Sequence, residues 1–166
     1  MNSEIKIIDN YLPEVKINYL ENLLLSDSFP YYYTISIAGE NSKIKDTFMF
    51  NHNLIKENKE VSTVGNIITN MIMYDVSHNY IYRSKINFYL KSHRLKKHKF
   101  HLDNSNLDIK IALFYVNTNN GYTEFEDKTI VKSVRNRLVM FNGNLKHRST
   151  TTTDTRHRIN ININYN

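Results

Sequence analysis

The chain contains no cysteine and no tryptophan, and only four glycines and two prolines among 166 residues. Without cysteine it can form no disulfide, zinc-thiolate site or thiol nucleophile, so any bound metal must be held by histidine and carboxylate side chains. No apolar run approaches the length of a membrane-spanning helix, and the N-terminus lacks the charged and then apolar pattern of a signal peptide. We therefore expect a cytoplasmic protein with no membrane partner.

The formal net charge is +6. An excess of this size suits an anionic partner, but it is also ordinary for a basic surface. The length is typical of one domain that can bury a proper hydrophobic core.

Two helices are expected in the first half of the chain. Pro13 suits a first helical turn, apolar residues follow from Val15 to Leu24 at helical spacing, and Phe29-Pro30 ends the element. A second helix is predicted over about Ser62 to His78, with an apolar side made of Val64, Ile67, Ile68, Met71 and Ile72.

Short strands are predicted elsewhere, separated by turn residues such as Asn119-Asn120-Gly121 and Asn142-Gly143-Asn144. Their spacing favours a sandwich or barrel, and we predict a mainly β fold with flanking α-helices, namely a double-stranded β-helix or jelly roll. The predicted strands are Ile5–Ile8, Tyr32–Ala38, Thr47–Phe50, Tyr80–Leu90, Phe100–Asp103, Lys110–Asn117, Tyr122–Phe125, Thr129–Val131, Arg137–Phe141 and Arg158–Asn164.

A candidate metal site is formed by His101-Leu102-Asp103 together with His147, which follows Asp103 by 44 residues. Ligands at i and i+2 point to the same face of a strand, and this face is the barrel interior if Phe100 and Leu102 pack outward. A third ligand from a distant strand then closes one triangular face of an octahedron. Two imidazoles and one carboxylate leave three positions open, as in non-haem Fe(II) oxygenases. A hydrogen-bonded surface pair is the alternative for a histidine near an acid.

The segments around this motif carry a family resemblance. Ile111–Phe125, Asn136–Phe141, His147 and Arg158–Asn162 together resemble the prolyl 4-hydroxylase-like branch of the Fe(II)/2-oxoglutarate-dependent oxygenases, especially its short bacterial and phage-type members. Ile5–Pro13 is similar to the family's first strand and helix. The resemblance implies one oxygenase domain over 1–166, with helical support in about 1–80 and a metal-binding core in about 80–166.

Carried over to this chain, the resemblance implies that His101, Asp103 and His147 bind Fe(II) and form the catalytic centre. 2-Oxoglutarate is the implied co-substrate, O2 the second one, and ascorbate an expected activator. Arg158 and Arg156 share a strand parity, and either could clamp the distal carboxylate of 2-oxoglutarate. Arg158 fits the family pattern of basic, apolar, small, apolar and polar residues, so it is favoured.

Further co-substrate contacts are implied at Tyr115, Tyr89 and Asn160. The Tyr115 phenol matches a family position that donates a hydrogen bond to the same distal carboxylate, although it could equally be a core tyrosine with another partner. Tyr89 lies on the strand before the metal motif. Asn160 and Asn162 share the parity of Arg158 and line the pocket unless the strand twists them toward solvent.

The implied reaction is hydroxylation of an unidentified substrate with release of succinate and CO2. A peptidyl proline or another protein side chain is the first candidate substrate. One alternative is hydroxylation of a free amino acid or small metabolite, and another is a non-catalytic, cupin-like metal-binding module.

The chain departs from the family pattern in the basic run Lys91–Lys99, which either steers an acidic peptide or nucleic acid strand or is a solvated loop. Nucleic acid is the less favoured partner, because the second arginine of nucleic-acid-dealkylating relatives is replaced by Asn164. We expect substrate specificity to come from Lys91–Lys99 and from Gly39–Glu60 at the pocket mouth. The remaining histidines are predicted on the surface: His52, His78, His93, His98 and His157.

Overall fold

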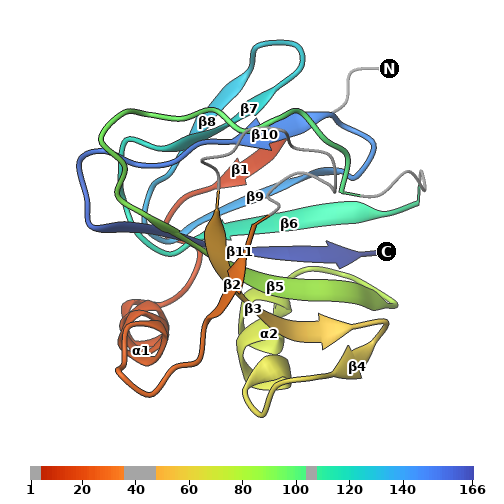
Figure 1. Ribbon diagram of the computed structural model, residues 1–166. Coiled ribbons are helices and arrows are strands. Elements are labelled where there is room, and N and C mark those ends of the chain that lie inside the picture. Colours follow the sequence, from red (N-terminus) through yellow and green to blue (C-terminus); the bar gives the residue numbers. More distant parts are fainter. Residues whose placement is uncertain (1–4, 36–47, 104–107) are drawn as a thin grey trace.

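The structure is a computed structural model that describes residues 5–35, 48–103 and 108–166 (Figure 1). Its helices are α1 (Glu14–Leu24) and α2 (Gly65–Met73). Its strands are β1 (Lys6–Ile8), β2 (Tyr32–Thr34), β3 (Met49–Lys56), β4 (Lys59–Glu60), β5 (Ile81–Leu90), β6 (Lys110–Tyr115), β7 (Tyr122–Phe125), β8 (Ile130–Lys132), β9 (Arg137–Asn142), β10 (His147–Ser149) and β11 (His157–Tyr165).

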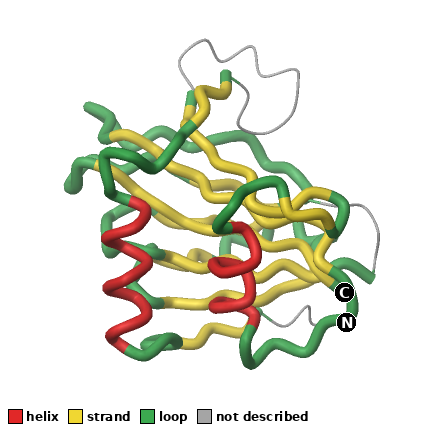
Figure 2. The backbone as a smooth tube through the Cα atoms, turned by 90° about the horizontal axis from the view of Figure 1, so that it is seen from below, coloured by secondary structure: helices red, strands yellow, loops and turns green. Residues whose placement is uncertain are grey.

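The strands form two antiparallel sheets. The large sheet has the order β1-β9-β6-β11-β5-β3-β2, with β4 paired to β3, and the small sheet has the order β10-β7-β8. Both helices lie along one face of the large sheet (Figure 2), and the small sheet lies on its other side (Figure 1). The predicted mainly β architecture with flanking helices is confirmed. Neither helix in the described residues is long and apolar enough to cross a membrane.

Strand β11 shows how the sequence builds this arrangement. Its isoleucines, Ile159, Ile161 and Ile163, join the buried cluster that includes residues of α1 and α2. Because successive side chains of a strand point to opposite faces, the alternate residues Arg158 to Asn164 point away from the helices. These polar residues are nevertheless buried. The space between the two sheets therefore has a polar floor at the centre of the large sheet.

The second helix is shorter than predicted, and Ile67 is 53% exposed rather than buried. Its buried side is made of Ile68, Thr69, Ile72 and Met73, so that Ile67 falls one position outside the covered stripe. In the first helix Val15 is exposed, because Ile17, Leu20 and Leu24 form the buried side.

Two predicted strands near the pocket differ at their ends. Strand β2 ends at Thr34, and the rest of the predicted strand to Ala38 lies mainly outside the described residues. Strand β3 runs well beyond the predicted Thr47–Phe50, whose first residue is also outside the described part. Residues 39–47 of the predicted specificity segment are likewise not described.

The prediction of a strand over Phe100–Asp103 is wrong. Only His101 pairs there, in an isolated antiparallel bridge with His147. The segment after β5 crosses from the large sheet to β10 (Figure 1), and contacts the small sheet at two separate bridges rather than along a ladder. Leu102 does pack outward, as the metal-site prediction required.

His52 is buried, and its surface placement was wrong. Its register partner on β5 is Ile86, so it lies on the helix-covered face of the sheet. Its Nδ1 lies 2.7 Å from the Pro30 carbonyl oxygen and its Nε2 2.7 Å from the Ser62 hydroxyl. These two partners satisfy the ring in the interior, which a hydrophobicity pattern does not reveal.

Candidate metal centre

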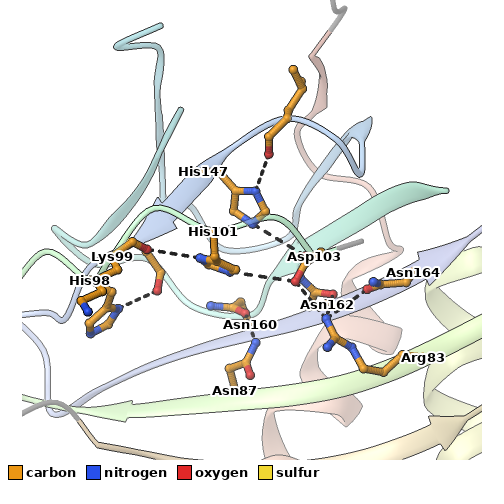
Figure 3. A network of polar contacts seen from close by, with 12 residues as sticks. Arg83, Asn87, His98, Lys99, His101, Asp103, His147, Asn160, Asn162 and Asn164 are labelled. Carbon is orange, nitrogen blue, oxygen red and sulfur yellow. Dashed lines mark hydrogen bonds and ion pairs between the residues drawn. The ribbon is translucent and has the colours of Figure 1, made fainter. Parts of the chain in front are cut away.

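His101, Asp103 and His147 converge between the two sheets (Figure 3). One ligand atom from each lies within 4.8 Å of the others. The Asp103 carboxylate lies 3.9 Å from His101 Nε2 through Oδ1 and 3.6 Å from His147 Nε2 through Oδ2. Although the expected strand is absent, the backbone N–H of His101 donates to the His147 carbonyl oxygen at 2.9 Å, and the His147 N–H donates to the His101 carbonyl oxygen at 3.1 Å. This bridge places the two imidazoles side by side.

Both imidazoles are oriented by the backbone. His147 Nδ1 lies 2.9 Å from the Leu145 carbonyl oxygen, and His101 Nδ1 lies 3.3 Å from that of Lys99. Since a carbonyl oxygen accepts, each Nδ1 carries the proton and each Nε2 presents its lone pair toward Asp103. Burial, reinforced by the charge of His147, lowers the pKa of His101 and favours its neutral form. A metal ion requires an imidazole that is oriented in this way and has an unprotonated Nε2.

Asp103 is held on both oxygens. Arg83 Nη2 donates to Oδ1 at 2.9 Å and Asn162 Nδ2 donates to Oδ2 at 2.7 Å (Figure 3). Burial by itself would raise the pKa of Asp103, but Arg83, His147 and Asn162 together lower it to about 2. The side chain is therefore a carboxylate at neutral pH, fixed in position from the floor of the large sheet.

A polar pocket opens beside the triad. Among the described residues that line it, Asp103 is the only acid. The lining residues are Met49, Arg83, Lys85, Asn87, Tyr89, His101, Asp103, Leu113, Thr123, His147, Ser149, Asn160 and Asn162.

Arg158 lies fully buried behind this pocket. Its Nε donates to the Ser133 hydroxyl at 2.8 Å and its Nη1 to the Thr150 carbonyl at 3.3 Å, while Nη2 has no partner. No carboxylate in the described residues pairs with it. A buried, uncompensated cation is costly, which makes this guanidinium a prepared site for an anion. Arg156, by contrast, is exposed and precedes β11.

The other predicted co-substrate residues surround Arg158. Its Cζ lies 5.3 Å from the Tyr89 ring centroid and 5.6 Å from that of Tyr115. The Tyr115 hydroxyl donates to Thr123 Oγ1 at 2.7 Å. Burial raises the pKa of both phenols, so both stay protonated and able to donate.

Asn160 lies on the pocket floor, where its Oδ1 accepts a hydrogen bond from Asn87 Nδ2 at 2.9 Å. Asn87, like Lys85 and Arg83, was not predicted in the site. A signal for them was present in the sequence, because they precede Tyr89 by two, four and six residues on one strand and so share its face.

His98 was predicted on the surface, but it is buried against the same group. Its ring stacks on that of Tyr89, with centroids 5.4 Å apart and 22° between planes, and its Nδ1 lies 2.7 Å from the Ser149 hydroxyl. Burial and the nearby Arg158 charge lower its pKa to about 3. Nothing in the basic run Lys91–Lys99 distinguishes this residue from its exposed neighbours, so sequence reasoning had no signal for it.

No protein-family model matches the sequence, and no curated protein matches it. Solved structures, however, share the fold. An oxidoreductase of the 2OG-Fe(II) oxygenase family from Burkholderia pseudomallei is 12% identical with a TM-score of 0.69, over 97% of this chain and 84% of that one.

Two further structures are similar over almost the whole chain. A Pseudomonas putida prolyl-4-hydroxylase is 13% identical with a TM-score of 0.64, over 99% of this chain and 93% of that one. The non-heme alpha ketoglutarate dependent carbocyclase SnoK from nogalamycin biosynthesis is 14% identical with a TM-score of 0.67, over 98% and 79%. The chain therefore has the double-stranded β-helix fold of the 2OG-Fe(II) oxygenases.

Proposed function

We propose that the protein is an Fe(II)- and 2-oxoglutarate-dependent oxygenase that hydroxylates a substrate and releases succinate and CO2. The observation that carries this proposal is the pairing of a His-Asp-His triad with a buried arginine that lacks an anion. A bare metal site has no need for such an arginine, which argues against the cupin-like binding module.

The residues fit the two groups that the proposal requires. Two neutral imidazoles and one carboxylate are a donor set typical of Fe(II), and they leave coordination positions free for co-substrate and O2. The unpartnered Nη2 of Arg158 fits a carboxylate, which a guanidinium binds through charge-assisted hydrogen bonds. 2-Oxoglutarate carries two carboxylates, so one would bind at the metal and the other at Arg158.

Each side chain then has a separable task. His101, Asp103 and His147 would hold the iron, and Arg158 would bind the distal carboxylate of 2-oxoglutarate. Tyr89 and Tyr115 flank the guanidinium and exclude water from it. When bound, iron, 2-oxoglutarate and O2 together supply the oxidising power, while the protein orients them.

The prolyl-4-hydroxylase among the similar structures supports a peptidyl proline as substrate, and the carbocyclase from nogalamycin biosynthesis supports a small molecule. The basic run gives weak support to an acidic macromolecule. Its Lys97 is already paired with Glu124, at 3.0 Å. Ascorbate is expected to sustain turnover.

The test is succinate production from 2-oxoglutarate with Fe(II), ascorbate and O2 in the absence of substrate. Wild type should show slow uncoupled turnover, and His101→Ala should show none. Arg158→Ala should raise the KM for 2-oxoglutarate by ~30-fold, since a hydrogen bond to a charged group contributes about 2 kcal/mol.

Exposed residues of the same type give matched controls, namely His93→Ala and Arg156→Ala, which should behave as wild type. An equal KM in Arg158→Ala and Arg156→Ala would contradict the assignment of the clamp. The absence of both succinate formation and any thermal stabilisation by Mn(II) with 2-oxoglutarate would favour the binding module.

A further inference from the structure

Lys85 lies on the same pocket floor as Tyr89 but far from Arg158. Along β5 and β11 the register pairs Tyr89 with Arg158, Asn87 with Asn160, and Lys85 with Asn162. At about 3.3 Å per residue, the four residues from Tyr89 to Lys85 span roughly 13 Å. Arg158 and Lys85 therefore mark two distant places on one floor.

The Asp103 carboxylate of the metal triad lies near the Lys85 end of this floor. Asp103 is held by Asn162, the register partner of Lys85.

The ammonium of Lys85 forms no ion pair with a described residue, although the nearby Asp103 carboxylate acts on it electrostatically. The side chain is half-buried in the pocket wall, and it makes no hydrogen bond or ion pair to another described residue. Asp103, the only acid of the described lining, already has one oxygen bonded to Arg83 and the other to Asn162. A cation in such a place is a site for an anion that comes from outside the protein.

A second unsatisfied group lies at the neighbouring register pair, Asn87 and Asn160. Asn87 donates to Asn160, but its own Oδ1 is buried with no donor in the described residues. 2-Oxoglutarate has no N–H or O–H group at neutral pH, so it cannot satisfy this acceptor. The pocket floor would therefore complement a ligand that carries a hydrogen-bond donor next to an anionic group.

We propose that Lys85 binds a carboxylate of the substrate and Asn87 its amine, so that the substrate is a free amino acid and not a residue within a peptide chain. This inference rests on the proposed oxygenase function and names the substrate class of that site. A peptidyl proline carries neither a charge for Lys85 nor a donor for Asn87, because its nitrogen and its carbonyl are both part of amide bonds.

The experiment measures binding and turnover with a matched panel. The common free L-amino acids, their α-carboxamides, small phosphate monoesters and blocked prolyl peptides are each added to the enzyme with 2-oxoglutarate. With Mn(II), which replaces iron, titration calorimetry gives the binding constant. With Fe(II), ascorbate and O2, stimulation of succinate formation and the gain of one oxygen in mass give turnover.

At least one free amino acid should bind and stimulate turnover in wild type, and its carboxamide should do so at least ~30-fold less well. Lys85→Met, which keeps the chain length, should weaken binding of that amino acid by ~30-fold, and Lys85→Arg should restore part of it. Lys59→Met, at an exposed lysine of β4, is the matched control and should bind as wild type. Circular dichroism verifies that each variant is folded.

The inference is overturned if carboxamides or peptides stimulate as well as free acids, if only phosphate monoesters do, if no member of the panel binds, or if Lys85→Met binds as tightly as wild type. Uncoupled turnover without substrate separates this failure from that of the oxygenase proposal. When wild type consumes 2-oxoglutarate alone but ignores amino acids, only the substrate class is wrong. When it neither consumes nor binds 2-oxoglutarate, the proposed function itself is wrong.

Discussion

Arg158 and His98 lie close together in the interior, and burial affects them in opposite ways. A guanidinium remains charged in proteins, so the buried charge of Arg158 destabilises the fold until an anion binds. An imidazole can lose its proton, and the pKa of His98 is lowered to about 3 by burial and by Arg158. The neutral ring then stacks on Tyr89, beside the anion site proposed at Arg158. His98 can thus lie close to the charged Arg158 because its own ring is neutral.

His98 should make stability fall in mild acid. Its pKa in the folded protein lies below its ordinary value of 6.5, so the unfolded chain takes up the proton first as the pH falls. Its contribution to stability is complete above pH 6.5 and is lost progressively toward pH 3. At pH 5 this one group should lower the free energy of unfolding by about 2 kcal/mol relative to pH 8.

Urea denaturation of the metal-free protein at pH 8 and pH 5 measures this loss. His98→Asn keeps an amide near the position of Nδ1 but does not titrate, so its loss between the two pH values should be about 2 kcal/mol smaller. His93→Asn, at an exposed position, should lose as much as wild type. Equal losses in wild type and His98→Asn would refute the assignment.

At the scale of elements, the turn before β7 determines how closely the chain approaches the arginine. A Cβ on Gly121 would lie 2.6 Å from Arg158 Cδ and 2.8 Å from the Thr151 carbonyl oxygen. Asn119, at the start of the same turn, accepts the Gly121 N–H on its side-chain oxygen at 3.0 Å. The turn that the sequence predicted from Asn119-Asn120-Gly121 therefore also packs against Arg158.

Gly121→Ala should weaken 2-oxoglutarate binding without touching the ligand. The added methyl group must displace Arg158 or the Thr151 backbone, and such overpacking costs roughly 1–3 kcal/mol of stability. We expect the KM for 2-oxoglutarate to rise by about tenfold, measured by uncoupled succinate formation.

Gly143→Ala is the control, because a Cβ there meets the Ile109 carbonyl oxygen at 2.9 Å, away from Arg158. It should lower the urea midpoint but leave the KM for 2-oxoglutarate unchanged. If the Gly121→Ala enzyme is destabilised but keeps the wild-type KM, the turn does not influence 2-oxoglutarate binding.

At the scale of the molecule, the candidate centre joins the two sheets. His147 begins β10 of the small sheet, while Asp103 is held by Arg83 from β5 and Asn162 from β11 of the large one. A metal ion would bind across this junction, and a co-substrate would extend the contact to Arg158. Occupancy should therefore stabilise the assembly of both sheets.

Mn(II) with 2-oxoglutarate, at about 100 times the dissociation constant, should raise the free energy of unfolding by about 2.7 kcal/mol. For a chain of this size this corresponds to roughly 5–10 °C in Tm. Thermal unfolding under nitrogen with and without EDTA measures the shift. His147→Ala should show no shift and His93→Ala the full one, whereas a full shift in His147→Ala would place the metal elsewhere.

Much of the pocket could be predicted from local sequence, because periodicity settles which face of a strand a side chain leaves from. The alternation Arg158-Ile159-Asn160-Ile161 places polar residues opposite the helix-covered face, and the same period of two extends from Tyr89 back to Lys85. The three residues of the triad were likewise predicted from type and spacing, although the strand proposed for two of them does not form.

Tertiary structure alone decides what each face meets. His98 and His52 look like surface residues because nothing local marks the neighbours that cover them. Ser133 and Thr150, which bind the Arg158 guanidinium, are 25 and 8 residues from it in sequence. Whether a charge such as that of Lys85 is paired depends on the distant groups that packing brings near. Side-chain direction is a property of the local backbone, whereas burial and pairing are properties of chain segments that only the folded state brings together.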